Sequence, residues 1–277
     1  MPRVSAGWRA RLLVAYSRLG YHKGKGIGEK ILKRALRVHD VATEGDHGLR
    51  YALATEDLVQ RAIYYHGAYE PASLTLMRGL LRSGDTMIDV GGHVGQYALH
   101  AAQVVGASGK VVVFEPSPRT HQYLLRNIAM NGFSWVTPVL GAVDQDLSIA
   151  RMSFGDDHNW GAARRTEPGS GTAFFCLTAP LRLTLPILGI QRIDVLKIDV
   201  EGLEGRVLHS IDYNGPLRPR NIILEYLPAH IAAQGCGDDV MQSLASNGYE
   251  VTDVFGNSLR PNVEPHEFNI WARDSRA

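Results

Sequence analysis

Short apolar runs alternate with amphipathic segments along most of the chain after residue 85. Runs rich in β-branched and other apolar residues predict buried strands at residues 86–90, 110–114, 136–140, 193–198 and 221–225. Apolar positions at helical spacing predict helices at residues 96–105, 117–130, 203–211 and 238–247. This alternation is typical of βαβ units, so we expect an α/β fold built on a doubly wound, mostly parallel sheet.

Two segments depart from this alternation and suggest the domain organisation. Residues 148–185 are strand-like but polar and rich in glycine, which predicts a hairpin-like insertion beside the site. Residues 1–48 are basic, and apolar residues between positions 8 and 19 recur at helical spacing. This spacing favours an accessory helix over a membrane-surface helix. We therefore expect a helical N-terminal appendage, residues 1–48, attached to one domain of residues 49–277.

Charge is distributed unevenly, although the totals nearly cancel. The 277 residues include 29 Lys and Arg against 28 Asp and Glu, a net charge of +1. Residues 1–40 hold ten basic residues and two acids, or +8, which leaves −7 for the remainder with its 19 basic and 26 acidic residues. This excludes a basic body that binds nucleic acid by counterion release. With two cysteines and no apolar run of roughly 20 residues, we expect a cytoplasmic protein without a disulfide scaffold or transmembrane segment.

A glycine-rich turn follows the first predicted strand of the sheet. Gly91 and Gly92 allow the chain to turn tightly, and Gly95 allows the next helix to approach the sheet closely. In a doubly wound sheet, ligands bind beyond the carboxyl ends of the strands. The turn is not the dinucleotide fingerprint, because His93 stands where that motif requires glycine.

Two acids near this turn indicate the kind of ligand. Glu115 comes twenty residues after Gly95 and just before Pro116, at the end of the next predicted strand. A carboxylate at that place can accept both hydroxyl hydrogens of a ribose, which indicates a nucleoside ligand. Asp89, just before the turn, can meet the ammonium group that S-adenosylmethionine has and NAD lacks. S-adenosylmethionine is therefore the expected cofactor, and an NAD-dependent oxidoreductase is the rival interpretation.

The most specific motif is Ile193-Asp-Val-Leu-Lys-Ile-Asp-Val-Glu-Gly-Leu-Glu204. This chain resembles the FkbM family of S-adenosylmethionine-dependent methyltransferases over residues 65–230. The resemblance also rests on the glycine turn, Phe-Glu-Pro at 114–116, Asn131, Gly-Ala-Tyr-Glu-Pro at 67–71 and Ile-Leu-Glu at 223–225. It implies a Rossmann-like class I methyltransferase that acts mostly on hydroxyl groups of sugars, polyketides or other secondary metabolites. Gly92-His93 departs from the Ala-Asn that family members usually carry, which affects the local cofactor contacts.

The Lys-Ile-Asp-Val-Glu segment supplies the candidate catalytic residues. Lys197 and Asp199 share one face of their strand, and Glu201 lies at its carboxyl end. Asp199 or Glu201 can accept a hydrogen bond from an acceptor hydroxyl while Lys197 steadies the developing oxyanion, and Glu225 is a second carboxylate at the next strand end. Two alternatives stay open. Lys197 and Asp199 can form a purely structural ion pair, or Asp199 and Glu225 can hold a divalent metal.

Flanking segments supply further cofactor candidates. Ala142 and Asp144 follow the third predicted strand, where methyltransferases of this architecture usually enclose the adenine. An ordinary turn role for Asp144 is an equal alternative. Tyr69 and Glu70 match the family pattern ahead of the sheet, and we expect them to fold over the cofactor.

The acceptor side is predicted more coarsely. We expect the insertion to line the acceptor pocket through His158, Asn159 and Trp160. The predicted activity is O-methylation of a small-molecule or glycan acceptor, with no nucleic-acid partner. The alternatives are methylation of an amine or carboxylate, and a non-catalytic module that binds S-adenosylmethionine. The N-terminal appendage offers a surface for a homo-oligomer.

Overall fold

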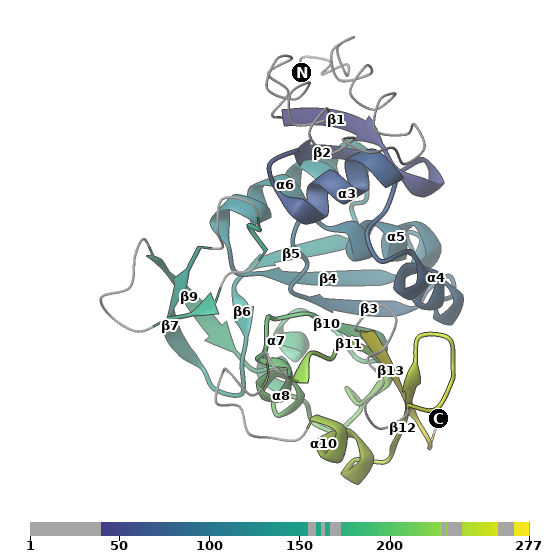
Figure 1. The fold of residues 1–277 in the computed structure, drawn as a ribbon. Helices are drawn as coiled ribbons and strands as arrows, with labels where there is room; N and C mark the ends of the chain where they lie inside the picture. Colours follow the sequence, from purple (N-terminus) through teal and green to yellow (C-terminus); the bar gives the residue numbers. More distant parts are fainter. Residues whose placement is uncertain are drawn as a thin grey trace, which may run out of the picture.

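The computed structural model describes residues 40–154, 159–161, 164–166, 173–228, 231, 240–259 and 269–276. Its centre is a seven-stranded sheet in the order β12–β13–β11–β10–β3–β4–β5 (Figure 1). Five neighbouring strands are parallel: β11 (Pro219–Glu225), β10 (Ile193–Ile198), β3 (Thr86–Val90), β4 (Lys110–Glu115) and β5 (Val136–Leu140). β13 (Asn269–Asp274) and β12 (Tyr249–Asp253) extend one edge in antiparallel pairing. The predicted mostly parallel α/β sheet is confirmed.

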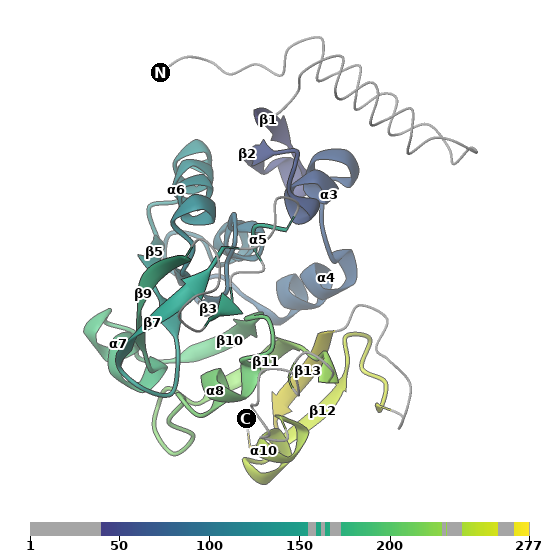
Figure 2. The same cartoon turned by 60° about the vertical axis from the view of Figure 1, so that its left-hand side comes forward.

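Helices cover both faces of this sheet. One face carries α4 (Pro71–Leu80), α5 (Gln96–Val105) and α6 (Pro118–Asn131), and the other carries α7 (Leu181–Ile187), α8 (Glu204–Leu208) and α10 (Val240–Ser246) (Figures 1 and 2). Side chains of β3 alternate between the two cores, so that Met87 packs with the first set of helices and Ile88 with the second. Burial on both faces explains why the parallel strands have nearly continuous apolar sequences.

The order of the strands locates the candidate site. From β3 the chain proceeds outward to β4 and β5, and later adds β10 and β11 on the other side of β3. The direction of winding therefore reverses between β3 and β10. Ligands of doubly wound sheets bind in the crevice at such a reversal, beyond the carboxyl ends of the strands.

The described chain begins with a hairpin that packs on α6. β1 (Asp40–Glu44) pairs with β2 (Arg50–Ala54) around the short 3-10 turn η1 (Asp46–Gly48). The backbone N–H of Ala52 donates to Asn127 Oδ1 at 2.6 Å, and that of Arg50 donates to Asn131 Oδ1 at 2.9 Å. The pairing crosses the boundary predicted at residue 48, so residues 40–48 fold with the residues that follow them. Residues 1–39, including the predicted appendage helix, lie outside the described residues.

A smaller sheet follows β5. Its order is β6 (Ala142–Val143), β9 (Ala173–Ala179), β7 (Ser148–Ser153) and β8 (Arg164–Arg165), and it lies beside the β5 edge of the central sheet (Figure 1). Within residues 148–185, β7 and β9 pair in antiparallel fashion. The insertion prediction missed α7, whose Leu181 and Leu185 are spaced by one helical turn and enter the main core.

The elements outside the parallel core were the least visible in the sequence. The hairpin β1–β2, helix α3 (Leu58–His66), α4 and the antiparallel pair β12–β13 were not predicted. Helix α8 covers only part of the predicted 203–211. None of the helices in the described part of the chain has the length and apolar character that a membrane span requires.

Candidate active site

The carboxyl ends of β3, β4, β10 and β11 surround a cavity of about 250 Å³. Most residues predicted for the site line this cavity. They are Tyr69, Glu70, Asp89, Gly91, Gly92, His93, Glu115, Pro116, Ala142, Asn159, Lys197, Asp199, Glu201 and Glu225. Gly95, Asp144 and Trp160 are not among its lining residues. His158 lies outside the described residues.

The glycine turn after β3 depends on the absence of side chains. A Cβ on Gly91, which has φ +88°, would lie 1.8 Å from the carbonyl oxygen of Asp199. A Cβ on Gly92 would lie 2.1 Å from Val113 Cγ1, and one on Gly95 would lie 2.6 Å from Leu124 Cδ1. The two strand ends therefore approach to a distance that only glycine allows. His93 has φ +50°, the left-handed conformation that glycine and asparagine adopt most readily.

Glu115 at the end of β4 is held by the chain itself. Its Oε2 accepts a hydrogen bond from the His93 backbone N–H at 2.8 Å. Its Oε1 accepts from the Ser117 backbone N–H at 2.8 Å and from the Thr120 hydroxyl at 2.7 Å. Burial raises the pKa of Glu115, against these donors and the positive charge of His93. A carboxylate has about four acceptor positions, so about one is left for a ligand.

Asp89 at the end of β3 is buried, and one of its carboxylate oxygens lacks a hydrogen-bond partner in the part of the chain that the structure describes. Its side chain is 1% exposed, and Oδ2 has no hydrogen-bond partner among the described residues. Burial raises the pKa of Asp89 to about 7, helped by Asp199 and Glu115 and opposed by Lys197. An unpaired carboxylate oxygen at the cavity wall is an acceptor position ready for a donor from a ligand.

Lys197 is the cation around which the carboxylates gather. Its Nζ lies 3.3 Å from Asp199 Oδ2 and donates to Asn269 Oδ1 at 3.1 Å, and the Lys197 side chain is 1% exposed. Burial alone would lower the pKa of Lys197, but Asp199, Glu70 and further carboxylates outweigh it and raise that pKa. The Asp199 side chain is 31% exposed, so it presents a charged face to the cavity while Lys197 supports it from behind.

The turn after β10 is also specialised. Glu201 has φ +58°, and Gly202 follows with φ +97°. Glu204 at the start of α8 closes this turn, since its Oε1 accepts from the backbone N–H groups of Val200 and Gly202 at 3.3 and 3.1 Å. The turn holds Glu201 at the cavity wall.

Glu225 completes the acidic side of the cavity. Burial raises its pKa to about 9, together with the negative charges of Asp199, Glu201 and Glu70. Glu225 of β11 lies opposite Asn269 in the antiparallel strand β13. Asn269 is the residue that accepts the hydrogen bond from Lys197. Across the described ranges, no three His, Cys, Asp or Glu side chains are grouped so as to hold a metal ion.

Comparison with known proteins identifies the family. The family model described as the methyltransferase FkbM domain matches residues 89–251, which is more than half of the chain and includes the carboxyl ends of all four strands around the cavity. The chain belongs to the FkbM family of S-adenosylmethionine-dependent methyltransferases. The methyltransferase sdnD of Sordaria araneosa is 22% identical over 242 residues, covering 76% of this chain and 88% of its own.

Two solved structures are similar at the level of the fold. A methyltransferase FkbM from Methylobacillus flagellatus KT has a TM-score of 0.44 at 17% identity, covering 95% of this chain and 58% of its own. A precorrin-6y C5,15-methyltransferase from Geobacter metallireducens GS-15 has a TM-score of 0.44 at 16% identity, covering 75% of this chain and 89% of its own. The strand order of the central sheet, with helices on both of its faces, is the Rossmann-like arrangement that the family resemblance implied for this FkbM methyltransferase.

The segment before α4, which lies ahead of the residues matched by the family model, folds against the start of α5. The backbone N–H of Tyr69 donates to Gln96 Oε1 at 2.7 Å, and Gln96 Nε2 donates to the Tyr69 carbonyl at 2.9 Å. The Tyr97 hydroxyl donates to Glu70 Oε2 at 2.8 Å. Glu70 adopts φ +51° at the N-cap of α4 and lines the cavity with Tyr69. Gln96 and Tyr97 were missed by sequence reasoning, since they appear there only as ordinary helix residues.

Asp57 connects three parts of this FkbM methyltransferase and was also missed. Its side chain is fully buried; Oδ1 caps α3 at the Gln60 N–H, and Oδ2 accepts from the Trp160 N–H at 2.8 Å. His93 Nε2 lies 3.6 Å from Asp57 Oδ1, an ion-pair distance longer than a hydrogen bond. Burial opposes the charge on His93, but Asp57, Glu115 and Asp199 outweigh it and raise the pKa of His93. A capping pattern of Asp before an apolar helix was the available signal.

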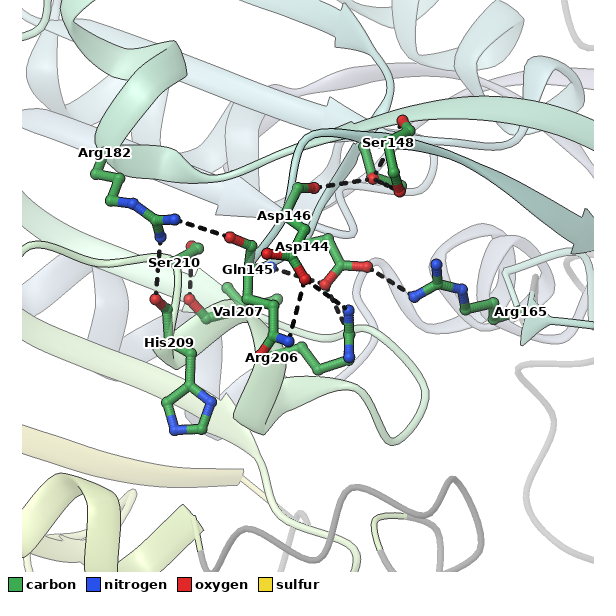
Figure 3. Close-up of polar contacts among 11 residues, drawn as sticks. Asp144, Gln145, Asp146, Ser148, Arg165, Arg182, Arg206, Val207, His209 and Ser210 are labelled. Carbon is green, nitrogen blue, oxygen red and sulfur yellow. Dashed lines mark hydrogen bonds and ion pairs between the residues drawn. The ribbon is translucent and has the colours of Figure 1, made fainter.

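Trp160 and Asp144, two residues predicted to contact a ligand, contact other side chains of the protein instead. Trp160 is buried, with the Arg119 guanidinium 3.1 Å from its ring centroid and Tyr123 6.0 Å away. Asp144 is held by two arginines: its Oδ1 accepts from Arg206 Nε at 2.6 Å and its Oδ2 from Arg165 at 3.0 Å (Figure 3). These side chains brace the small sheet and the α6 side, while Asn159 and Ala142 line the cavity.

Proposed function

We propose that this FkbM methyltransferase transfers a methyl group from S-adenosylmethionine to a hydroxyl group of an uncharged small molecule or glycan. The observation that carries the proposal is the half-buried Asp199 carboxylate, supported by buried Lys197 at the reversal point of the sheet. S-adenosylmethionine, when bound, supplies an electrophilic methyl group on a sulfonium centre. The enzyme then has to orient the acceptor and accept its proton.

The residues on the β3 and β4 side fit this cofactor. The buried Asp89 Oδ2 has no partner among the described residues and suits an ammonium donor. Glu115 retains about one acceptor position, which suits a ribose hydroxyl. The glycine turn keeps this wall free of side chains, as a close backbone approach to a ligand requires.

The β10 and β11 side suits proton acceptance. Asp199 is the proposed proton acceptor for the hydroxyl, and Lys197 fixes the direction of its carboxylate through the 3.3 Å contact. Glu201 and Glu225 orient the acceptor from the same wall. Holding Asp199 by a buried cation limits the rotamers of the carboxylate, which favours a productive geometry.

The charge of the cavity supports an uncharged acceptor. Glu70, Asp199 and Glu201 line it beside Glu225, whose raised pKa keeps it protonated near neutral pH, and Lys197 is the counter-charge among them. Like charges close together disfavour an anionic acceptor, which argues against carboxyl methylation and against phosphorylated acceptors. The same acids attract a protonated amine, so N-methylation is the second candidate.

The test is Asp199→Asn compared with the exposed Asp146→Asn. We expect Asp199→Asn to lower methyl transfer to a panel of hydroxylated compounds by about 10²–10⁴-fold, the usual contribution of a general base. Calorimetry should give an S-adenosylmethionine affinity close to that of the unmodified protein. Unchanged S-adenosylhomocysteine release by Asp199→Asn would exclude the proposed role. Loss of activity in EDTA, restored by magnesium, would instead favour the metal alternative for Asp199 and Glu225.

A further inference from the structure

The outer face of the small sheet carries exposed apolar side chains that none of the described residues covers. β7 and β9 alternate strictly, so that Ala150 and Cys176 face inward as a buried pair and Ile149 and Leu177 face outward as an exposed pair. The exposed fractions of Ile149 and Leu177 are 70% and 59%. Water thus faces the apolar side of a sheet whose inner side is already packed.

More apolar side chains extend this face. Phe175 follows on β9 with 74% exposure, Leu147 leads into β7 with 64%, and Leu140 at the end of β5 is 55% exposed. The end of β5 lies beside this sheet, because a Cβ on Gly141, the residue after Leu140, would lie 3.2 Å from the Leu177 carbonyl oxygen, and we count exposed Leu140 with the face for that reason. We call these five side chains the outer patch: Leu140, Leu147, Ile149, Phe175 and Leu177.

We propose that the outer patch is the interface of a symmetric dimer of this chain. At roughly 200 Å² for a large apolar residue, the exposed fractions give the patch an apolar area of about 600 Å². That is the upper end of what a monomer usually leaves exposed. Two copies of the patch bury about 1,200 Å² together, which reaches the range of specific interfaces. A partner protein with a smaller apolar surface would bury less area than that range requires.

Shape and charge favour a second copy over a membrane. One face of a two-stranded sheet can stack on another such face in the manner of a β-sandwich. Surfaces that bind anionic lipid carry clusters of several basic residues. Within β7 and β9 the basic residue is Arg151, which lies across from Phe175, and nearby Arg165 and Arg206 are paired with Asp144 (Figure 3).

The dimer would support the cavity from outside. Met152 of β7 faces inward and lines the cavity, as does Ala142 of β6. The small sheet is therefore a wall with the cavity on one side and the outer patch on the other. Pairing of two patches would stiffen this wall without adding a side chain to the site.

Sedimentation of the full chain across a concentration series tests the proposal. We expect a dimer whose dissociation constant rises about 30-fold or more in Phe175→Glu, as when a central interface residue is lost. Phe255→Glu is the matched control, because Phe255 is 60% exposed in the turn after β12, at a distant part of the fold. S-adenosylmethionine binding by Phe175→Glu checks that the variant is folded.

Three results would overturn the proposal. One is a monomeric unmodified chain at about 100 μM, a concentration at which even weak dimers of this size associate. Another is an undiminished dimer in Phe175→Glu. The third is flotation of the unmodified chain with phosphatidylcholine–phosphatidylserine vesicles that Phe175→Glu abolishes while its oligomeric state stays the same. A dimer that is lost on deletion of residues 1–39 but kept by Phe175→Glu would give the interface to the N-terminal arm instead.

Discussion

Glu115 and Glu225 end parallel strands of the same sheet and face the same cavity, yet their surroundings differ. Glu115 receives three hydrogen bonds from its own chain. Glu225 meets the charges of Asp199, Glu201 and Glu70, and burial with these charges raises its pKa to about 9. The β4 side of the cavity is therefore assembled before a ligand arrives, whereas the β11 side holds charges that a ligand or a proton must balance.

Glu115→Ala removes the hydrogen bonds that organise the β4 side of the cavity, and we expect it to have the largest effect on cofactor affinity and stability. It leaves the N–H groups of His93 and Ser117 and the Thr120 hydroxyl without their acceptor, at about 1–3 kcal/mol for each buried donor left unpaired. We expect S-adenosylmethionine affinity to fall about 100-fold or more and the melting temperature to drop. Calorimetry and thermal melts measure both. Unaltered cofactor affinity in Glu115→Ala would contradict the ribose assignment.

Asp57→Asn should loosen the glycine turn without removing the helix cap, because asparagine also caps helices. Since the folded state raises the pKa of His93, the Asp57–His93 pair stabilises the protein below about pH 6.5. That stabilisation is lost as pH rises through the folded pKa. We expect the unmodified protein to lose stability over this range and Asp57→Asn to show a flatter pH profile. Parallel profiles for the two proteins would contradict the coupling.

Glu225→Gln tests the β11 side of the cavity, because it removes a buried titratable carboxyl group and keeps a side chain of similar shape. The folded state holds a proton on Glu225 up to about pH 9, while the unfolded chain releases it near 4.5. The unfolded state binds fewer protons between these values, so Glu225 costs stability as pH rises. We expect Glu225→Gln to match the unmodified protein near pH 4.5 and to be the more stable of the two at pH 8, by at least a few degrees in melting temperature. A variant less stable at pH 8 would mean that Glu225 is paired rather than repelled.

Deletion of residues 1–39, which ends just before β1, should have the smallest effect on the cofactor. All residues proposed to hold S-adenosylmethionine lie between Tyr69 and Asp199. We expect unchanged cofactor affinity, with any change confined to acceptor use or oligomeric state. Loss of cofactor binding in a folded deletion variant would show that the arm contributes to the site.

The sequence predicted the parallel strands and most cavity residues because each strand end carries a local signal. Asp89, Glu115 and Lys197 follow apolar runs or fall within them, and their placement then follows from the topology rule for doubly wound sheets. Asn269 has no local signal of this kind, and the capping position of Asp57 indicates the start of a helix but not a part in the site. They act through contacts between segments distant in the sequence, such as the 3.1 Å hydrogen bond from Lys197 to Asn269.

Asp144 and Trp160 show a different limit. Both lie in segments next to the cavity, but neither lines it, and neighbouring arginines contact their side chains instead. Which of several neighbouring polar or aromatic residues faces a ligand depends on long-range packing, which spacing along the chain does not encode.

The contact between Gly91 and the Asp199 carbonyl has a consequence for reading mutants of this site. Because the two backbones touch, any side chain introduced at position 91 would push the proposed proton acceptor as well as the cofactor turn. Such a variant would have lower cofactor affinity and lower turnover, and the same steric clash would cause both losses. In mutational scans of this enzyme, a loss of activity on substitution at position 91 should therefore be interpreted as a change in both the β3 side and the β10 side of the cavity.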